Sequence, residues 1–276
     1  LLTAPDGAVF AVNASACRLF GWTAEEMIRG GRDVLVDSSD PQLAVALEEQ
    51  TRTGSYQGPL TFIAKGGRRF PGEVSSVVFR DKDGNNRTSM TIRDITEKKR
   101  METERLVLQE ITLSLLANRD LREFLRQVHA SISKVVFAEN FFVALYNKAT
   151  GLFEEAYNVD RFDAYFPPSK LEKSISKHVF RTGRPFLFYR EVFEEMKVRG
   201  EVEQVGAPSP SWMGAPLNTA SETIGVMVVQ DYDLKDRYTR QDLNLFASIA
   251  AQVALAVEYV RTQEEVKRQL EEKNTL

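Results

Sequence analysis

The sequence predicts an α+β protein of two domains, each with a central antiparallel sheet flanked by helices, joined and followed by long helices of coiled-coil type. Three observations support this class. The length of 276 residues suits about two domains. Strand patterns of period two, separated by glycine turns, occur in both halves. Between the two halves, residues 94–102 mark the change from a strand-rich segment to a charged helical segment.

Composition excludes several classes of function. The net charge of -3 shows no basic excess typical of nucleic-acid binding, so we expect no nucleic-acid partner. A single cysteine, Cys17, excludes an intramolecular disulfide and favours a reducing compartment. No apolar run approaches the roughly 20 residues that cross a bilayer, so we expect no membrane span and a cytoplasmic location. The chain starts without methionine and ends in a polar helix, so we expect a piece of a longer protein.

The first hundred residues predict one five-stranded sheet with short helices after its second strand. Thr23 and Glu26 have capping-box spacing and open one helix. Asp40 followed by Pro41 opens another, which runs to about Thr51. The expected strands are Leu1–Ala4, Ala8–Val12, Gly58–Lys65, Arg69–Arg80 and Arg87–Arg93.

The segment after the last of these strands predicts a helix that joins the two domains. Asp94 and Glu97 again have capping-box spacing, so the helix can begin here. The apolar residues that follow have a three-four spacing, which suits a short parallel two-stranded coiled coil between two copies of the chain. The alternative is an ordinary surface helix packed on its own domain. The apolar seam consists of Met101, Leu108, Ile111 and Leu115.

The second half predicts another sheet with helices. Asp120 and Glu123 cap a first helix, and a long final helix begins at about Arg240. Residues 191–206 are polar and predict a helix or a mobile loop near a pocket. Pro167-Pro168 forbids helix in the stretch before the helix expected over Ser174–Arg181. The expected strands are Asn140–Asn147, Leu152–Asn158, Pro185–Tyr189, Ser211–Leu217 and Thr223–Asp231.

Residues 1–97 resemble a PAS domain. The resemblance is carried by Leu19-Phe20-Gly21-Trp22-Thr23, Phe70-Pro71-Gly72-Glu73, the Asp83-Gly84 turn and the closing Asp94-Ile95-Thr96-Glu97-Lys98. It implies a sheet curled around a pocket, with Asp94, Ile95 and Thr96 as the signal exit. The segment has no histidine, which argues against haem, and Cys17 lies outside the motif of the light-sensing flavin proteins. Candidate pocket residues, for which packing in the core is the favoured interpretation, are Trp22, Phe62, Phe79, Met90 and Ile92.

Residues 119–257 resemble a GAF domain. The resemblance is carried by Gly183-Arg184-Pro185, Ser211–Leu217, Tyr238–Leu243 and Ile249–Glu258, and it implies a small-molecule pocket on one face of a sheet. No cysteine is present to attach a bilin, and Asn147-Lys148 matches only the start of the cyclic-nucleotide signature. Candidate pocket residues, for which packing in the core is again the favoured interpretation, are Phe180, Phe186, Phe188, Trp212 and Met227.

No catalytic arrangement is visible. His129 lacks the glutamate and proline that follow a phospho-accepting histidine, and a lone His178 on an amphipathic helix is usually structural. No glycine-rich nucleotide loop or metal-ligand cluster occurs.

We therefore expect a dimeric sensory module that binds an unidentified small ligand. Helices at 98–118 and 258–276 would relay its signal to an output domain. The order of domains resembles the input half of a sensor histidine kinase. Alternatives are the input of a diguanylate cyclase, or an interaction scaffold that binds no ligand.

Overall fold

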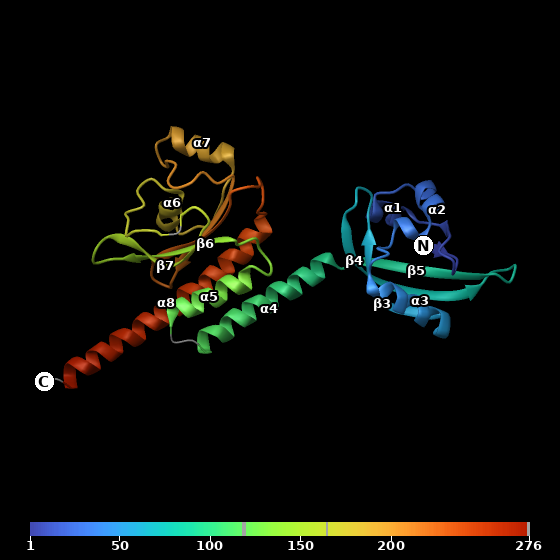
Figure 1. Cartoon of the computed structure of the whole chain (residues 1–276), viewed down its shortest axis with the longest axis horizontal. Coiled ribbons are helices and arrows are strands. Elements are labelled where there is room, and N and C mark those ends of the chain that lie inside the picture. The colour runs from blue at the N-terminus through green and yellow to red at the C-terminus, as the bar shows by residue number, and fades with distance from the viewer. Residues whose placement is uncertain (118–119, 164, 275–276) are drawn as a thin grey trace. The chain divides into compact units, whose positions relative to one another are not determined.

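The structure, a computed structural model, describes the chain except for residues 118–119, 164 and 275–276, and except for the side chains of 115–117, 264–265 and 267–274. Figure 1 shows the elements in order along the chain. The chain divides into two compact units, an N-terminal unit of Leu1–Glu102 and a C-terminal unit of Thr103–Leu276.

The N-terminal unit is built on a five-stranded antiparallel sheet of order β2-β1-β5-β4-β3. Glycine turns join the three long strands, and along β4 buried and exposed residues alternate, so one face of the sheet forms the core. This alternation confirms the period-two pattern of the sequence. The strands are β1 (Leu2–Thr3), β2 (Val9–Ala11), β3 (Ser55–Ile63), β4 (Arg69–Arg80) and β5 (Asn86–Asp94).

Short helices close the core of the N-terminal unit. The predicted capping box is present, because the Thr23 hydroxyl accepts from the Glu26 N–H and the Glu26 carboxylate accepts from the Thr23 N–H. Asp40 caps α3, with Pro41 at its first position. The helical elements are α1 (Ala14–Phe20), α2 (Ala24–Gly30), the 3₁₀ turn η1 (Arg32–Val34) and α3 (Pro41–Thr53).

Helix α4 (Thr96–Ala117) leaves the sheet directly after β5. The Asp94 carboxylate accepts a hydrogen bond from the Thr96 N–H at 2.9 Å and another from its hydroxyl, while the Ile95 N–H donates to the carbonyl of Pro71 in β4 at 3.0 Å. The start of α4 is therefore tied to the paired strands β4 and β5. A shift of those strands displaces the start of the helix as well.

The C-terminal unit also contains a five-stranded antiparallel sheet, in the order β7-β6-β10-β9-β8. The predicted strand over Pro185–Tyr189 is shorter in the structure, because Tyr189 already precedes a helix. The strands are β6 (Asn140–Asn147), β7 (Leu152–Val159), β8 (Phe186–Leu187), β9 (Ser211–Asn218) and β10 (Thr223–Asp231).

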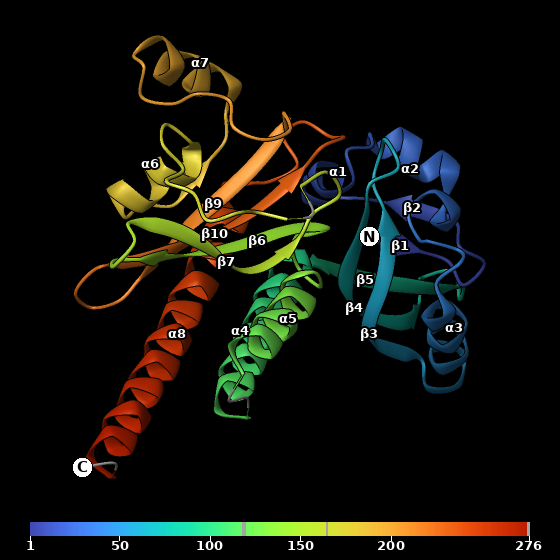
Figure 2. The same ribbon diagram turned by 60° about the vertical axis from the view of Figure 1, so that its left-hand side comes forward.

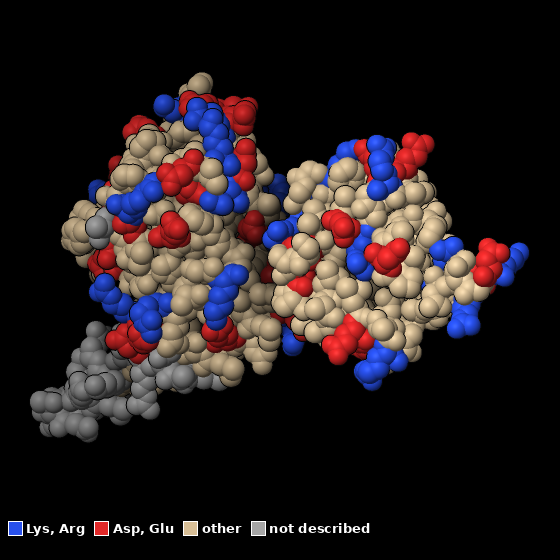
Figure 3. Space-filling model, turned by 45° about the vertical axis from the view of Figure 1, so that its right-hand side comes forward, with Lys and Arg blue, Asp and Glu red and all other residues tan. Residues whose placement is uncertain are grey.

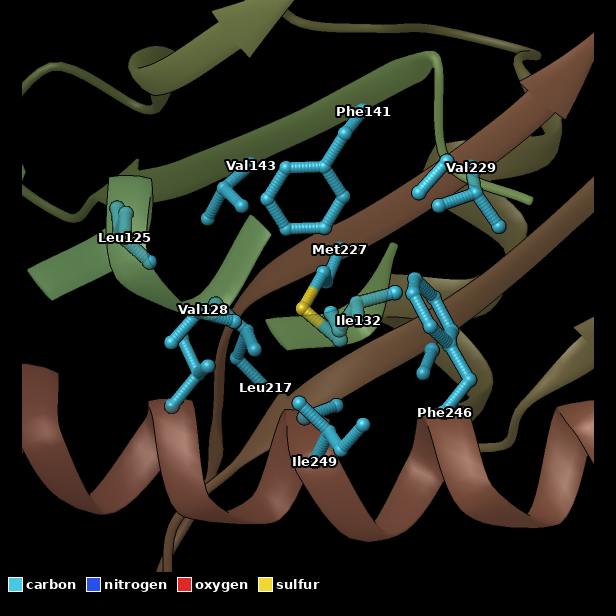
Figure 4. Packing of buried hydrophobic residues seen from close by; sticks show 14 of the residues in the cluster. Leu125, Val128, Ile132, Phe141, Val143, Leu217, Met227, Val229, Phe246 and Ile249 are labelled. Atoms are coloured by element: carbon cyan, nitrogen blue, oxygen red, sulfur yellow. The ribbon is translucent and has the colours of Figure 1, made fainter. Parts of the chain in front are cut away.

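Helices cover both faces of this second sheet (Figure 2). On one face the apolar side chains of α5 and α8 meet the strands, with Met227 of β10 pointing toward them (Figure 4). On the other face α6 lies over the strands, against Val226 and Val228 of β10, and α7 forms a separate small cluster with Phe186 and Phe188. Consecutive residues of β10 thus serve two separate cores. The helices are α5 (Leu121–Ile132), α6 (Ile175–Thr182), α7 (Arg190–Val198) and α8 (Arg240–Asn274).

These two units confirm the predicted α+β class with two antiparallel sheets flanked by helices. Among the described residues, one segment, Arg240–Gln263 of α8, is long and apolar enough to cross a membrane, and half of it is buried in the unit. A core helix of a globular domain has the same composition, so this is weak evidence for a membrane span. On the face that Figure 3 shows, acidic and basic side chains are interspersed over each unit.

Candidate functional site

A cavity of about 270 Å³ lies in the C-terminal unit, on the face of the sheet that carries α6 and α7. Its floor is formed by β6, β9 and β10, and its walls by the segment between β7 and α6 and the segment between α7 and β9. Because both walls are loops, the sheet fixes the floor while the loops determine the shape and charge of the opening.

Asp160, at the end of β7, is held in the cavity wall by neutral donors. Its carboxylate accepts from the Gln230 amide at 2.8 Å, from the Tyr232 hydroxyl at 2.9 Å, and from the N–H groups of Phe162 and Asp163. Burial and the hydrogen bond to Asp160 both raise the pKa of Tyr232, so the phenol stays protonated and donates. The wall therefore carries a positioned carboxylate.

Asp163 connects the two loops at the cavity. Its backbone carbonyl accepts from the Asn158 amide at 2.7 Å, and its carboxylate accepts a long hydrogen bond of 3.5 Å from the N–H of Ala207 on the opposite loop. This second contact is weak, so the Asp163 carboxylate retains capacity to bind another donor. A third carboxylate, Glu203, is paired with Lys173 at 2.6 Å.

Aromatic rings form most of the apolar surface of the cavity. Phe142 and Phe166 meet edge to face with their centroids 5.0 Å apart, and Phe188 and Phe193 lie 5.4 Å apart. Trp212, at the start of β9, lies among them and is largely buried. A mainly apolar concavity with a few fixed polar groups is the usual form of a small-molecule site.

The N-terminal unit contains a second, much smaller cavity of about 50 Å³ between the sheet and α3. Phe62 and Met90 line it, together with the polar groups of Gln50 and Ser76, which hydrogen-bond to each other at 3.0 Å. This space is on the order of two water molecules at about 30 Å³ each.

The predicted pocket residues are divided between cavities and cores. In the C-terminal unit, Phe188 and Trp212 line the cavity. Phe180 and Phe186 pack against the neighbouring apolar cluster, whereas Met227 lies on the opposite face of the sheet, fully buried toward α5 and α8.

The predicted pocket residues of the N-terminal unit are divided in the same way. Phe62 and Met90 line the small cavity. Trp22 and Ile92 pack against the core, and Phe79 is 42% exposed.

The predicted seam of α4 is divided between two environments. Ile111 is 1% exposed within the core of the C-terminal unit, and Leu108 packs against that core. Met101 is 62% exposed. Leu106 and Leu113, which lie outside the predicted seam, are 52% and 58% exposed. The side chain of Leu115 lies outside the described residues.

The two histidines and the cysteine lie outside both cavities. His129 is hydrogen-bonded to the carbonyl of Ala138 at 2.6 Å and to the Tyr157 hydroxyl at 3.1 Å, so it links α5 to the sheet. The Nδ1 atom of His178 is buried without a partner among the described residues, and burial lowers the pKa of this ring. Cys17 is half-buried and packs against the core of its unit. No group of three metal-binding side chains occurs among the described residues.

Sequence reasoning missed the polar residues of the large cavity. Asp160, Asp163 and Glu203 lie in segments without a regular period, where no hydrophobic pattern indicates which way a side chain points. A usable signal was present, since an Asp-x-x-Asp sequence followed by Pro167-Pro168 marks a loop of restricted shape.

Two separate family models match the chain. Residues 1–97 match the PAS domain, and residues 118–258 match the GAF domain. PAS and GAF domains are sensory domains that are found in signalling proteins, and both are regulatory modules. The GAF match covers just over half of the 276 residues, so the chain belongs to the GAF domain family. No curated protein matches the chain.

A solved GAF domain agrees with the GAF assignment at the level of the fold, and two further solved structures are similar at lower scores. The GAF domain of a phosphoenolpyruvate-protein phosphotransferase from Coxiella burnetii is 12% identical, with a TM-score of 0.50, and the match covers 59% of this chain and 98% of that one. A PAS domain from a two-component sensor histidine kinase is 18% identical, with a TM-score of 0.30, covering 34% and 80%. The chromophore-binding domain of a bacteriophytochrome from R. palustris is 11% identical, with a TM-score of 0.43, covering 95% and 93%.

Proposed function

We propose that this chain is the cytoplasmic sensory input region of a bacterial signalling protein, and that its GAF domain binds a small ligand. The output domain is most consistent with a histidine kinase of a two-component system, with a diguanylate cyclase as the alternative. The cavity of about 270 Å³, with its positioned carboxylates and aromatic walls, is the observation that carries the proposal.

The signal leaves through the helices that flank the GAF domain. A ligand can shift an equilibrium between two arrangements only by its difference in affinity for them. The cavity floor includes β9, and α8 packs on the opposite face of the same sheet, so a change in the strands displaces that helix. Rotation or translation of α8 would then reach the output domain.

Exposed apolar side chains on α4 and α8 support a parallel homodimer. Leu106 and Leu113 of α4 are seven residues apart and both more than half exposed. On α8, Leu255 and Tyr259 are also more than half exposed. Apolar residues at heptad-related spacing on a solvated helix face are typical of helices that pair with a second copy.

Retention of a ligand tests the sensory function. The whole chain, purified without denaturation, should release a small molecule detectable by native mass spectrometry, and that molecule should raise the melting temperature when added back. A chain that carries no small molecule, and whose melting temperature is unchanged by a broad metabolite panel, would contradict ligand sensing.

The dimer has its own test. Leu255→Asp should dissociate the chain to monomers at tens of micromolar in light scattering, because a charge replaces an apolar contact between copies. Lys197→Asp, an exposed substitution on α7, serves as the control and should leave the mass unchanged. A parent chain that is already monomeric would overturn this part of the proposal.

The PAS domain fits the scaffold function better than ligand sensing. Its cavity of about 50 Å³ is too small for a metabolite, and its interior is filled by aromatic rings. We propose that the PAS domain binds no ligand of its own. It passes a displacement of its strands to the start of α4 through Asp94, Ile95 and Thr96. A small molecule retained with hydrogen-exchange protection confined to residues 1–97 would contradict this assignment.

A further inference from the structure

We propose that the GAF cavity binds a small alkylammonium ion. This inference rests on the sensory function proposed above and adds the chemical class of the ligand. Three independent properties of the cavity lead to it: the charge of its wall, the chemistry of its apolar surface, and its volume.

The wall of the cavity is negative. Its described lining residues include three carboxylates and no lysine, arginine or histidine. Lys173 compensates Glu203, but Asp160 and Asp163 form no ion pair with any described residue. Asp160 is half-buried and Asp163 is exposed at the opening. Two carboxylates without a protein cation repel an anionic ligand and attract a cationic one. Phosphate-bearing ligands are therefore disfavoured.

The hydrogen-bond donors of Asp160 bring no positive charge to its carboxylate. All of its donors are neutral: two backbone N–H groups, one amide and one phenol. Hydrogen bonds to the charged form stabilise a carboxylate without neutralising it. The arrangement thus supplies a fixed negative charge whose counter-ion has to come from outside the described residues.

The apolar walls also favour a cation. An ammonium group is attracted to the face of an aromatic ring within about 6 Å of the centroid, and the attraction is strongest for tryptophan. Trp212, Phe188 and Phe193 line the same space as Asp160 and Asp163. The combination of aromatic rings and carboxylates suits a cation that carries alkyl groups, because its methyl and methylene groups contact the rings while its charge meets the carboxylates.

The volume limits the size of this cation. About 270 Å³ is slightly below the range of about 300 to 1,000 Å³ that drug-sized ligands occupy. A quaternary ammonium alcohol or a short primary amine fits such a space.

Matched pairs of probes test the charge requirement in the whole chain. Choline is compared with 3,3-dimethyl-1-butanol, its uncharged isostere, and butylammonium with 1-butanol, by calorimetry. Each cation should bind at least about tenfold more tightly than its neutral partner, equivalent to about 1.4 kcal/mol. Hydrogen exchange should slow at residues 160–174 and 199–210, which places the ligand in the cavity.

Asp163→Asn tests the carboxylate directly. Because the Asp163 side chain makes one long hydrogen bond, at 3.5 Å, and no other with the described residues, the substitution should leave the fold intact. Cation affinity should fall by about tenfold while the affinity for the alcohols is unchanged. Glu172→Gln is the control, since Glu172 is an exposed acid of the same loop that does not line the cavity, and it should bind the cations as the parent does.

The outcomes separate this inference from the function on which it rests. Equal affinity for cations and alcohols, or a retained anionic or neutral molecule, would overturn the alkylammonium assignment and leave ligand sensing in place. Failure of all four probes, in a chain that retains no small molecule, would overturn both. Tight cation binding that Asp163→Asn does not weaken would also overturn the site proposed here.

Discussion

Beneath the PAS sheet, the rings of Phe20, Phe62 and Phe70 lie 5.5 to 5.7 Å apart, and about 50 Å³ remains open nearby. In the GAF domain, phenylalanines instead surround a cavity of about 270 Å³, while a separate core fills the other face of the sheet. Both domains use a five-stranded antiparallel sheet, so the difference arises from what covers each face.

The comparison shows how a small domain gains room for a ligand. Within its own unit, the PAS sheet has one apolar face, so the residues that stabilise the domain are also those that would line a pocket. The GAF sheet is covered on both faces, and α5 with α8 forms a core that does not depend on the cavity. One face can then remain partly open, because the other supplies the stability.

The two cavities also differ in charge. Arg32 lines the PAS cavity, and it forms no ion pair with a described residue. The GAF cavity has carboxylates and no basic group among its described lining residues. If both cavities bound ligands, the ligands would have opposite charge.

The largest expected effect is on the filled face of the GAF sheet. Ile111→Asp should lower the free energy of unfolding by at least about 4 kcal/mol, because it removes buried apolar surface and places a carboxylate where it has no partner. Denaturant unfolding followed by circular dichroism measures this loss. Gln109→Asp, two residues earlier on α4 and exposed, should change stability little. Equal losses would mean that α4 does not pack as described.

A second pair of substitutions compares the two interiors directly. Phe62→Ala in the PAS domain should cost about 3 kcal/mol, because the ring is 1% exposed and contacts two others. Phe166→Ala, at the wall of the GAF cavity, should cost about 1 kcal/mol, since a half-buried side chain beside open space loses fewer contacts. Hydrogen exchange resolves the two domains within one chain. A greater loss at Phe166 would contradict the difference in packing.

Much of the fold could be predicted from local patterns. The alternation in β6 anticipates two buried faces, because Phe141 and Val143 face one core while Phe142 and Ala144 face the other. Helix starts at Thr23 and Asp120 followed from capping residues, whose effect is local.

The candidate site could be predicted only in part. Phe188 and Trp212 were identified, but an alternating strand does not reveal which of its faces has the open space, and Met227 turned out to lie on the filled side. The polar wall depends on loops brought together from residues 160–174 and 199–210, a long-range contact that no periodic pattern encodes. The same limit applies to α4, where a three-four spacing fits both a partner helix and its own domain.

The last effect concerns acid stability at the end of β10, the central strand of the GAF sheet. Asp231 ends β10 and is buried, accepting from the N–H groups of Asp233 and Leu234 and from Arg237 at 2.6 Å. Burial alone raises the pKa of Asp231, but these hydrogen bonds outweigh it and hold the pKa below its ordinary value. Because the folded pKa is depressed, the stabilisation is present above the unfolded value of about 3.9 and disappears as the pH falls through the folded pKa.

Asp231→Asn should therefore destabilise the GAF domain by about 2 kcal/mol at pH 7 and by progressively less below about pH 4, because hydrogen bonds to a charged acceptor contribute more than those to an amide. Thermal unfolding from pH 3 to pH 7 measures the difference between parent and variant. Asp233→Asn is the control, since Asp233 makes an exposed pair with Arg161 and should have little effect at either pH. A difference that stays constant with pH would mean that the charge of Asp231 is not what stabilises this end of β10.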